Sequence, residues 1–185
     1  MKVDLTWLIA ILLLTAVVIM RLGALASRID RLHHRIDLSR AALDAQLIRR
    51  SRAAEALATS ELVDPASAIV LARAASNSRN ADPADPLERS VVESEMSRDL
   101  REVFADAQSI AELRATPRGE ELFDDLAESC TQVALSRRFL NDAVQSARLL
   151  RQGRLVRLFR LAGNAPRPET FEMDDLTPPA FEAFA

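Results

Sequence analysis

Residues 5–20 read LTWLIAILLLTAVVIM, and this uncharged stretch decides how the 185-residue chain is organised. As a helix it covers roughly 24 Å, a little less than the roughly 30 Å hydrocarbon core of a bilayer. Arg21 follows this stretch, but its long side chain can reach the membrane surface while its backbone stays in the helix. The small and apolar residues 22–26 then lengthen the apolar helix to about one full membrane span. Trp7 then lies near one interface. We therefore expect residues 1–26 to form an N-terminal membrane anchor.

The charges that flank this anchor predict its orientation. Lys2 and the amino terminus precede the span. The cations that follow it are Arg21, Arg28, Arg31, Arg35 and Arg40. Because flanks rich in Lys and Arg stay in the cytoplasm, we expect a single-pass protein of the cell membrane, with its N-terminus outside and its helical body in the cytoplasm.

A cleaved signal peptide is the alternative interpretation of the same segment. Ala24-Leu25-Ala26 before Ser27 has the small-x-small form of a cleavage site, and cleavage there would release a secreted bundle. The acidic Asp4 beside Lys2 and the helical pattern that continues past Ala26 favour the uncleaved anchor.

The rest of the chain has the composition of a helical protein. It is 49% hydrophobic but only 4% aromatic and has four glycines, so its core consists mainly of Ala, Leu, Val and Ile. Ala and Leu are among the best helix formers. From Leu22 to Leu47 the apolar residues are spaced by three, four and seven, and no proline precedes Pro65. We expect the first helix to continue to about Leu62.

Three later helix starts share one device, a capping residue followed by proline. These pairs are Asp64-Pro65, Asp85-Pro86 and Thr116-Pro117. They predict helices over residues 65–80, 86–114 and 117–152. The apolar residues assigned to the buried face of the second of these are Leu87, Val91, Leu100, Val103, Phe104, Ala107, Ile110 and Leu113.

The predicted fold is therefore all-α. A transmembrane helix continues into an antiparallel up-and-down bundle of about four helices over residues 27–163. The proline-rich tail, residues 164–185, is expected to be extended or disordered.

Two polar motifs lie on the first and the last long helices. Residues 44–50 read DAQLIRR and residues 134–144 read ALSRRFLNDAV. They resemble the "D-x-Q-L-x-R-R" and "A-x-x-R-R-x-Y-N-D-x-V" motifs of the LemA family, and the order of anchor, first motif, proline-marked turn and second motif is also similar. Leu140 stands in place of the family tyrosine, AAEAL at 53–57 in place of "I-P-N-L-V", and Gln152-Gly153 in place of a Phe-Pro break. The chain thus resembles a divergent member, which implies a membrane-anchored helical bundle with no established activity and no catalytic residues.

Two interpretations of these motifs remain open. Either they form a polar network that joins the two helices, or they are solvated faces whose ion pairs each contribute about 0.5 kcal/mol. The network residues would be Asp44, Gln46, Arg49, Arg50, Arg137, Arg138, Asn141 and Asp142.

Arginine recurs at every third residue near the end of the fourth predicted helix. The residues are Arg148, Arg151, Arg154, Arg157 and Arg160. In an antiparallel bundle this helix returns toward the membrane, which brings the arginines close to the cytoplasmic leaflet. Each cation near an anionic membrane surface contributes about 1 kcal/mol of attraction, so we expect these arginines to contact anionic lipid. A protein partner is the second interpretation, and binding to nucleic acid is not expected.

Catalysis and cofactor binding are not expected. The chain has no glycine-rich phosphate loop, its two histidines are adjacent, and Cys130 is its only cysteine. Asp30, His34 and Asp37 share one helical face that suits a metal, but no second helix supplies companion ligands. The sequence therefore predicts a non-enzymatic protein without cofactor or metal, which acts through protein contacts or self-assembly. An enzyme or metal site within the bundle is the alternative.

Overall fold

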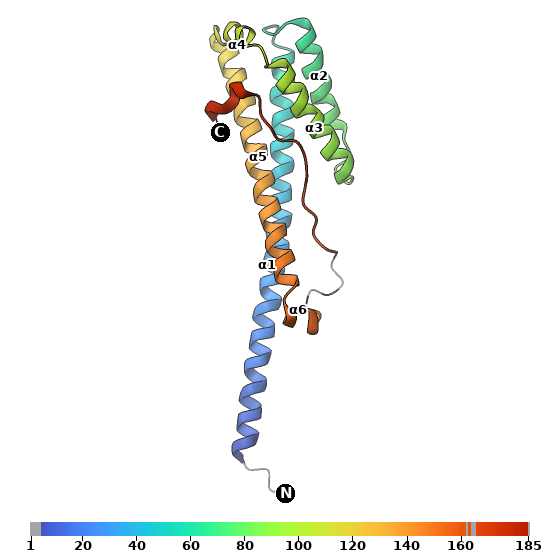
Figure 1. Cartoon of the computed structure of the whole chain (residues 1–185), viewed down its shortest axis with the longest axis vertical. Coiled ribbons are helices and arrows are strands. Elements are labelled where there is room, and N and C mark those ends of the chain that lie inside the picture. The colour runs from blue at the N-terminus through green and yellow to red at the C-terminus, as the bar shows by residue number, and fades with distance from the viewer. Residues whose placement is uncertain (1–4, 162, 164–165, 185) are drawn as a thin grey trace. The chain divides into compact units, whose positions relative to one another are not determined.

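The computed structural model describes residues 5–161, 163 and 166–184, and these residues are helical or irregular, without a β-strand (Figure 1). The helices are α1 (Leu5–Ala58), α2 (Pro65–Asn80), α3 (Pro86–Val103), α4 (Ala107–Arg114), α5 (Pro117–Arg151), α6 (Arg154–Leu158) and the 3-10 helix η1 (Pro179–Phe184). The all-α prediction is confirmed, and so is the long apolar helix at the N-terminus.

Helix α1 contains the stretch of the described chain that is long and apolar enough to cross a membrane. Every side chain from Thr6 to Met20 is exposed. The hydroxyl in the middle of this stretch is satisfied within the helix, because Thr15 Oγ1 donates to the carbonyl of Ile11 at 2.8 Å. This surface has the properties that a hydrocarbon environment requires.

Helix α1 ends at Ala58, four residues before the predicted end near Leu62. The hydroxyl of Ser60 donates to the carbonyl of Leu57 at 2.7 Å, and Glu61 adopts a φ of 60°. A left-handed residue of this kind stops the helix. The caps predicted from sequence are present, since Asp64 and Asp85 each accept backbone N–H groups at the starts of α2 and α3.

The helix predicted over residues 86–114 is interrupted in the structure. Helix α3 stops at Val103 and α4 starts at Ala107. Two residues explain the break: Phe104 is buried in the core, and Asp106 caps α4 by accepting both the N–H and the hydroxyl of Ser109. The Asp106-x-x-Ser109 spacing was a capping signal that the periodicity of the segment obscured.

The chain divides into two compact units. The smaller comprises residues 1–38 and 142–170, and the larger residues 39–141 and 171–185. These limits do not coincide with the expected boundaries at residues 26 and 163, because α1 and α5 each contribute to both units.

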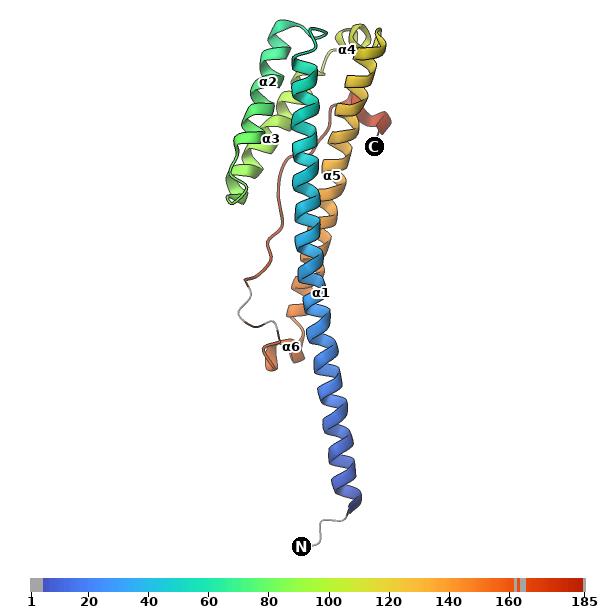
Figure 2. The same cartoon turned by 180° about the vertical axis from the view of Figure 1, so that it is seen from behind.

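The larger unit contains the main core. Helices α2 and α3 pack side by side, next to the α1 and α5 segments of this unit (Figures 1 and 2). Its largest fully buried side chains include Phe123, Phe181, Leu57, Leu71, Met96 and Leu126. Phe181 comes from the tail, and its ring lies 5.2 Å from that of Phe104 and 5.1 Å from that of Phe123. The tail therefore completes this core.

The smaller unit has a thinner core. Its buried side chains are Ile29 and Ile36 of α1, Ala143, Val144 and Ala147 of α5, and Val156 of α6. After Gly153, α6 and the following residues turn back, and Gly163 has a φ of 55°. This turn positions residues 166–170 near the last turns of α5.

Candidate functional site

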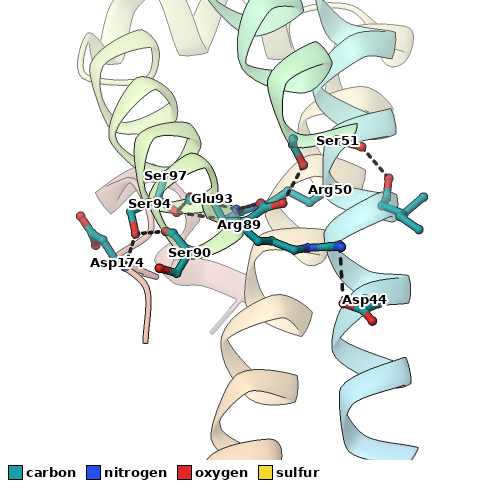
Figure 3. Close-up of polar contacts among 11 residues, drawn as sticks. Asp44, Arg50, Ser51, Arg89, Ser90, Glu93, Ser94, Ser97 and Asp174 are labelled. Atoms are coloured by element: carbon teal, nitrogen blue, oxygen red, sulfur yellow. Dashed lines mark hydrogen bonds and ion pairs between the residues drawn. The ribbon is translucent and has the colours of Figure 1, made fainter. Parts of the chain in front are cut away.

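A buried ion pair lies at the centre of the polar residues of the larger unit (Figure 3). Arg50 Nη2 lies 2.6 Å from Glu93 Oε2, and the two side chains are 2% and 0% exposed. Ser78 donates to Glu93 Oε1 at 2.7 Å, and Arg50 Nη1 donates to Ser97 Oγ at 3.0 Å. Both carboxylate oxygens of Glu93 thus have partners, which is the condition under which a buried charge is tolerated.

A second ion pair between α1 and α3, with the positions of cation and carboxylate exchanged, lies nearer the surface. Arg89 Nη2 is 3.5 Å from Asp44 Oδ1, with the arginine buried and the carboxylate partly exposed (Figure 3). The Nε atoms of Arg50 and Arg89 have no hydrogen-bond partner among the described residues. Asp44 and Arg50, predicted to face the last long helix, thus bind residues of α3.

Arg49 joins α1 to α5, but through residues outside the second motif. Its Nη2 donates to Asp125 at 2.8 Å and to Glu128 at 2.9 Å. These two hydrogen bonds raise the pKa of the guanidinium. All three side chains are between 40% and 54% exposed, so the contribution to stability is about 1 kcal/mol or less.

The second motif binds the tail rather than α1. Arg137 Nε donates to Asp175 Oδ2 at 2.9 Å. Asn141 forms a reciprocal pair with the backbone of Phe171, accepting its N–H at 2.9 Å and donating to its carbonyl at 3.2 Å. Arg138 and Asp142 are exposed and make no side-chain hydrogen bond or ion pair within the described part of the chain.

Gln46 is the remaining member of the predicted network. Its Oε1 is buried and has no hydrogen-bond partner in the described structure. The eight residues therefore do not form one network. Arg49 joins α1 to α5, Asp44 and Arg50 join α1 to α3, and two residues of the second motif hold the tail.

The partners of these residues in α3 and in the tail were not predicted from the sequence. Arg89, Glu93, Met96 and Leu100 are buried at helical spacing, whereas Leu87 and Val91, assigned to the buried face, are exposed. The missed signal was an Arg and a Glu four residues apart in phase with Met96 and Leu100.

The tail is attached to the larger unit by acidic side chains. Arg101 holds Asp174 through two hydrogen bonds, of 2.6 Å and 3.1 Å, and also donates to the carbonyl of Leu176 at 2.7 Å. The Arg101 guanidinium keeps the pKa of Asp174 below its usual value. Asp174 N–H donates to Ser94 Oγ at 3.0 Å. Residues 171–178 are therefore extended but fixed in place.

A cavity of about 600 Å³ lies in the smaller unit, where α5 ends and the chain turns back. Its arginines are Arg148, Arg151, Arg157, Arg160 and Arg167. Four of these belong to the series predicted from the sequence, whereas Arg154 is exposed and does not line the cavity. Arg167 was missed because it lies in the tail, which has no helical periodicity.

The residues considered for metal binding or nucleophilic chemistry are not brought together. Asp30, His34 and Asp37 are exposed along α1, and no group of three or more candidate metal ligands occurs among the residues that the structure describes. Cys130 is buried, and its burial raises the pKa of the thiol to about 11. A thiol with such a pKa is protonated at neutral pH and is a poor nucleophile.

Comparison with protein-family models, with characterised proteins and with solved structures finds no match for this chain. The similarity to the LemA family therefore stays a resemblance of motifs.

Proposed function

We propose that this protein is a single-pass, membrane-anchored helical bundle of the LemA type, without catalytic activity, which works as a scaffold or assembly protein at the cytoplasmic face of the cell membrane. One observation carries the proposal. Residues 6–20 of α1 are uncharged and all exposed, so no other part of the described chain covers them. An apolar surface of this length is stable in a lipid bilayer and unfavourable in water.

The orientation rests on the distribution of charge along α1. Arg21, Arg28 and Arg31 follow the apolar stretch and are exposed. The preference of such cations for the cytoplasmic side supports an N-terminus outside the cell. The same arginines lie next to anionic headgroups in this orientation, which is favourable.

The interaction role rests on apolar side chains that the larger unit leaves exposed. Leu135 and Phe139 lie four residues apart on α5, and Phe139 is 58% exposed. Residues at this spacing lie on the same side of a helix. A second copy or another protein that covers them would bury apolar surface at little cost.

Cysteine labelling tests the anchor and its orientation. In a Cys130→Ala background, Lys2→Cys places one thiol before the apolar stretch and Arg118→Cys places one after it, at the start of α5. We expect an impermeant maleimide to label position 2 in intact cells and position 118 only after lysis, and the protein to stay in the membrane pellet at alkaline pH. Release into the supernatant, or an intact mass that corresponds to cleavage after Ala26, would refute the proposal.

Photo-crosslinking tests the interaction role. A photoreactive amino acid at Phe139 in cells is expected to give a product that contains either two copies of the chain or one copy and a defined partner. The same amino acid at Arg118, an exposed residue at the start of α5, is the matched control. Equal yields from the two positions would show that the contact at Phe139 is not specific.

A further inference from the structure

The cavity of the smaller unit has an unusual concentration of like charge. Five arginines and one carboxylate, Glu169, line it, which leaves a net charge of four positive units around about 600 Å³. Like charges at this density repel one another and destabilise the turn unless an anion neutralises them.

The arginines of the cavity divide into two groups. Arg148 Nε donates to the carbonyl of Pro168 at 2.9 Å and Arg151 Nη1 donates to the carbonyl of Pro166 at 2.7 Å, so these two fix the returning chain against α5. Arg157, Arg160 and Arg167 are exposed, and their guanidinium groups form no hydrogen bond or ion pair with any residue that the structure describes. Three planar donors therefore face a cavity whose wall is already held in place.

The backbone at Arg160 is strained. Its φ of 49° lies in the left-handed region, which is unfavourable for a residue with a side chain. Three residues later Gly163 has a φ of 55°, which is free of strain for glycine. Strained residues of this type concentrate at sites with a function. At position 160 the strained residue is one that lines the cavity with a cation.

The residues beside the cavity match a membrane surface. Leu158 is 73% exposed, Leu155 is 49% exposed and Phe159 is 47% exposed, all on α6 or directly after it. They belong to the same compact unit as the apolar part of α1. Apolar side chains interleaved with arginines are typical of segments that lie at the headgroup level, with the apolar groups among the acyl chains.

The kind of cation in the cavity restricts the class of ligand that can bind. Lys2 is the only lysine of the chain, so every cation of the cavity is an arginine. Guanidinium groups bind phosphate oxygens through two parallel hydrogen bonds, which a lysine ammonium does not. The geometry thus favours phosphate groups over a diffuse negative surface.

From these observations we propose that the cavity is a saturable binding site for the headgroup of an anionic phospholipid that carries more than one negative charge. Arg157, Arg160 and Arg167 bind the phosphate oxygens, while Leu158 and Phe159 enter the adjacent acyl layer. The proposal rests on the proposed membrane location and adds to it a specific ligand class, since nonspecific attraction to an anionic surface needs no cavity.

Native mass spectrometry of the full chain in detergent tests this proposal. The probes are short-chain phosphatidic acid and cardiolipin, each with more than one negative charge, and phosphatidylglycerol and phosphatidylcholine as references. We expect one bound lipid per chain, with the first two probes bound at least about tenfold more tightly than phosphatidylglycerol. Equal binding of all four probes would overturn the proposal.

Matched variants separate the cavity from general electrostatics. Arg160→Gln combined with Arg167→Gln is expected to weaken phosphatidic acid binding by about tenfold or more, because charge-assisted hydrogen bonds are lost. Arg118→Gln combined with Arg138→Gln removes the same charge from exposed residues of the larger unit and is expected to change binding less than twofold. An equal loss in the two double variants would contradict a defined site.

The variant Arg160→Gly distinguishes a loss of lipid binding from a loss of folding. Glycine relieves the strained φ, so this variant is expected to keep or increase the thermal stability of the protein and still to bind phosphatidic acid more weakly. Unchanged binding by this variant would remove Arg160 from the site and overturn its assignment.

Inorganic pyrophosphate distinguishes a lipid from a soluble phosphate compound. We expect it to compete with phosphatidic acid only at concentrations at least about tenfold above those of the lipid, because it lacks the acyl chains that Leu158 and Phe159 contact. Equal or tighter binding of pyrophosphate would overturn the lipid assignment. Because this measurement is made in detergent, it is independent of the labelling experiment, so either proposal can fail without the other.

Discussion

Glu93 is a charged residue at a position where helical periodicity places an apolar one. It is fully buried, in phase with Met96 and Leu100, and its charge is balanced by Arg50 across the bundle. Such a pair contributes little net stability compared with apolar residues of similar volume. Loss of one partner is costly, because the other charge stays buried.

Substitutions of this pair give the first prediction. Arg50→Met or Glu93→Leu alone is expected to destabilise the protein by about 3–5 kcal/mol, and the double variant to recover most of that loss. The measurement is chemical unfolding of the full chain in detergent. The control is Arg49→Met, which breaks exposed ion pairs and should cost about 1 kcal/mol or less. Additive losses in the double variant would mean that the two side chains do not interact.

Gly119 is a position where the fold leaves no room for a side chain. A Cβ atom there would lie 1.9 Å from the backbone carbonyl oxygen of Leu113, so the turn between α4 and α5 leaves no room for a side chain. Gly119→Ala is expected to cost about 1–3 kcal/mol. Gly23→Ala meets nothing within 4 Å and is expected to leave the thermal midpoint unchanged or raised. A midpoint that falls equally in both variants would contradict this explanation.

At the scale of elements, the tail is the part that composition describes least well. Its prolines predict an extended chain, which residues 166–178 are, but they say nothing about what the chain packs against. The attachment depends on Arg101, Arg137 and Asn141, each far from its partner in sequence. Phe181 then occupies the core between Phe104 and Phe123.

Phe181→Ala tests whether the tail is part of the fold. Loss of a buried aromatic side chain is expected to destabilise the larger unit by about 3–5 kcal/mol. It should also increase amide hydrogen exchange at Phe171 and Asp174, whose N–H groups donate to Asn141 and Ser94. Pro179→Ala, at an exposed position of the same tail, is the matched control. Unchanged exchange in Phe181→Ala would mean that the acidic contacts alone hold the tail.

The helices themselves were predictable to different degrees. The starts at Pro65, Pro86 and Pro117 follow from local chemistry, because a capping side chain and a proline act within one turn. The break between α3 and α4 depends on the local cap Asp106 and also on Phe104, whose burial depends on residues far away in the sequence. The series of arginines could be recognised in the sequence because its spacing is local. The cavity could not, because it forms only when the returning chain brings Arg167 next to that series.

At the scale of the whole molecule, the net charge of −3 hides a segregation of sign. Arginines are concentrated at the cavity of the smaller unit, whereas the acidic residues of the tail, including Asp174 and Asp175, bind arginines of the larger unit. The arginine-lined cavity is therefore available to an anionic ligand, whereas Asp174 and Asp175 of the tail are neutralised by arginines of the protein itself. Carboxylates that are paired in this way make the stability of the larger unit depend on pH.

Acid is accordingly expected to weaken the larger unit. Hydrogen bonds from Ser67, from Ser109 and from Arg101 lower the pKa values of Asp64, Asp106 and Asp174, respectively. Because each folded-state pKa lies below the usual value of about 3.9, the unfolded chain binds more protons near that pH. The stabilisation is fully present above about pH 5 and is lost as the pH falls through the folded-state pKa values.

Asp174→Asn isolates the contribution of the tail to this dependence. The variant loses the ion pair with Arg101, so its thermal midpoint is expected to be lower than that of the unmodified protein at pH 7. The two midpoints are expected to approach each other as the pH falls from about 5 to 3, because the unfolded chain of the unmodified protein then binds the proton that the paired carboxylate in the folded protein resists. Glu169→Gln changes a carboxylate outside the larger unit and should leave the pH profile of that unit unchanged. A difference between Asp174→Asn and the unmodified protein that stays constant from pH 7 to pH 3 would show that geometry, and not charge, holds the tail at this residue.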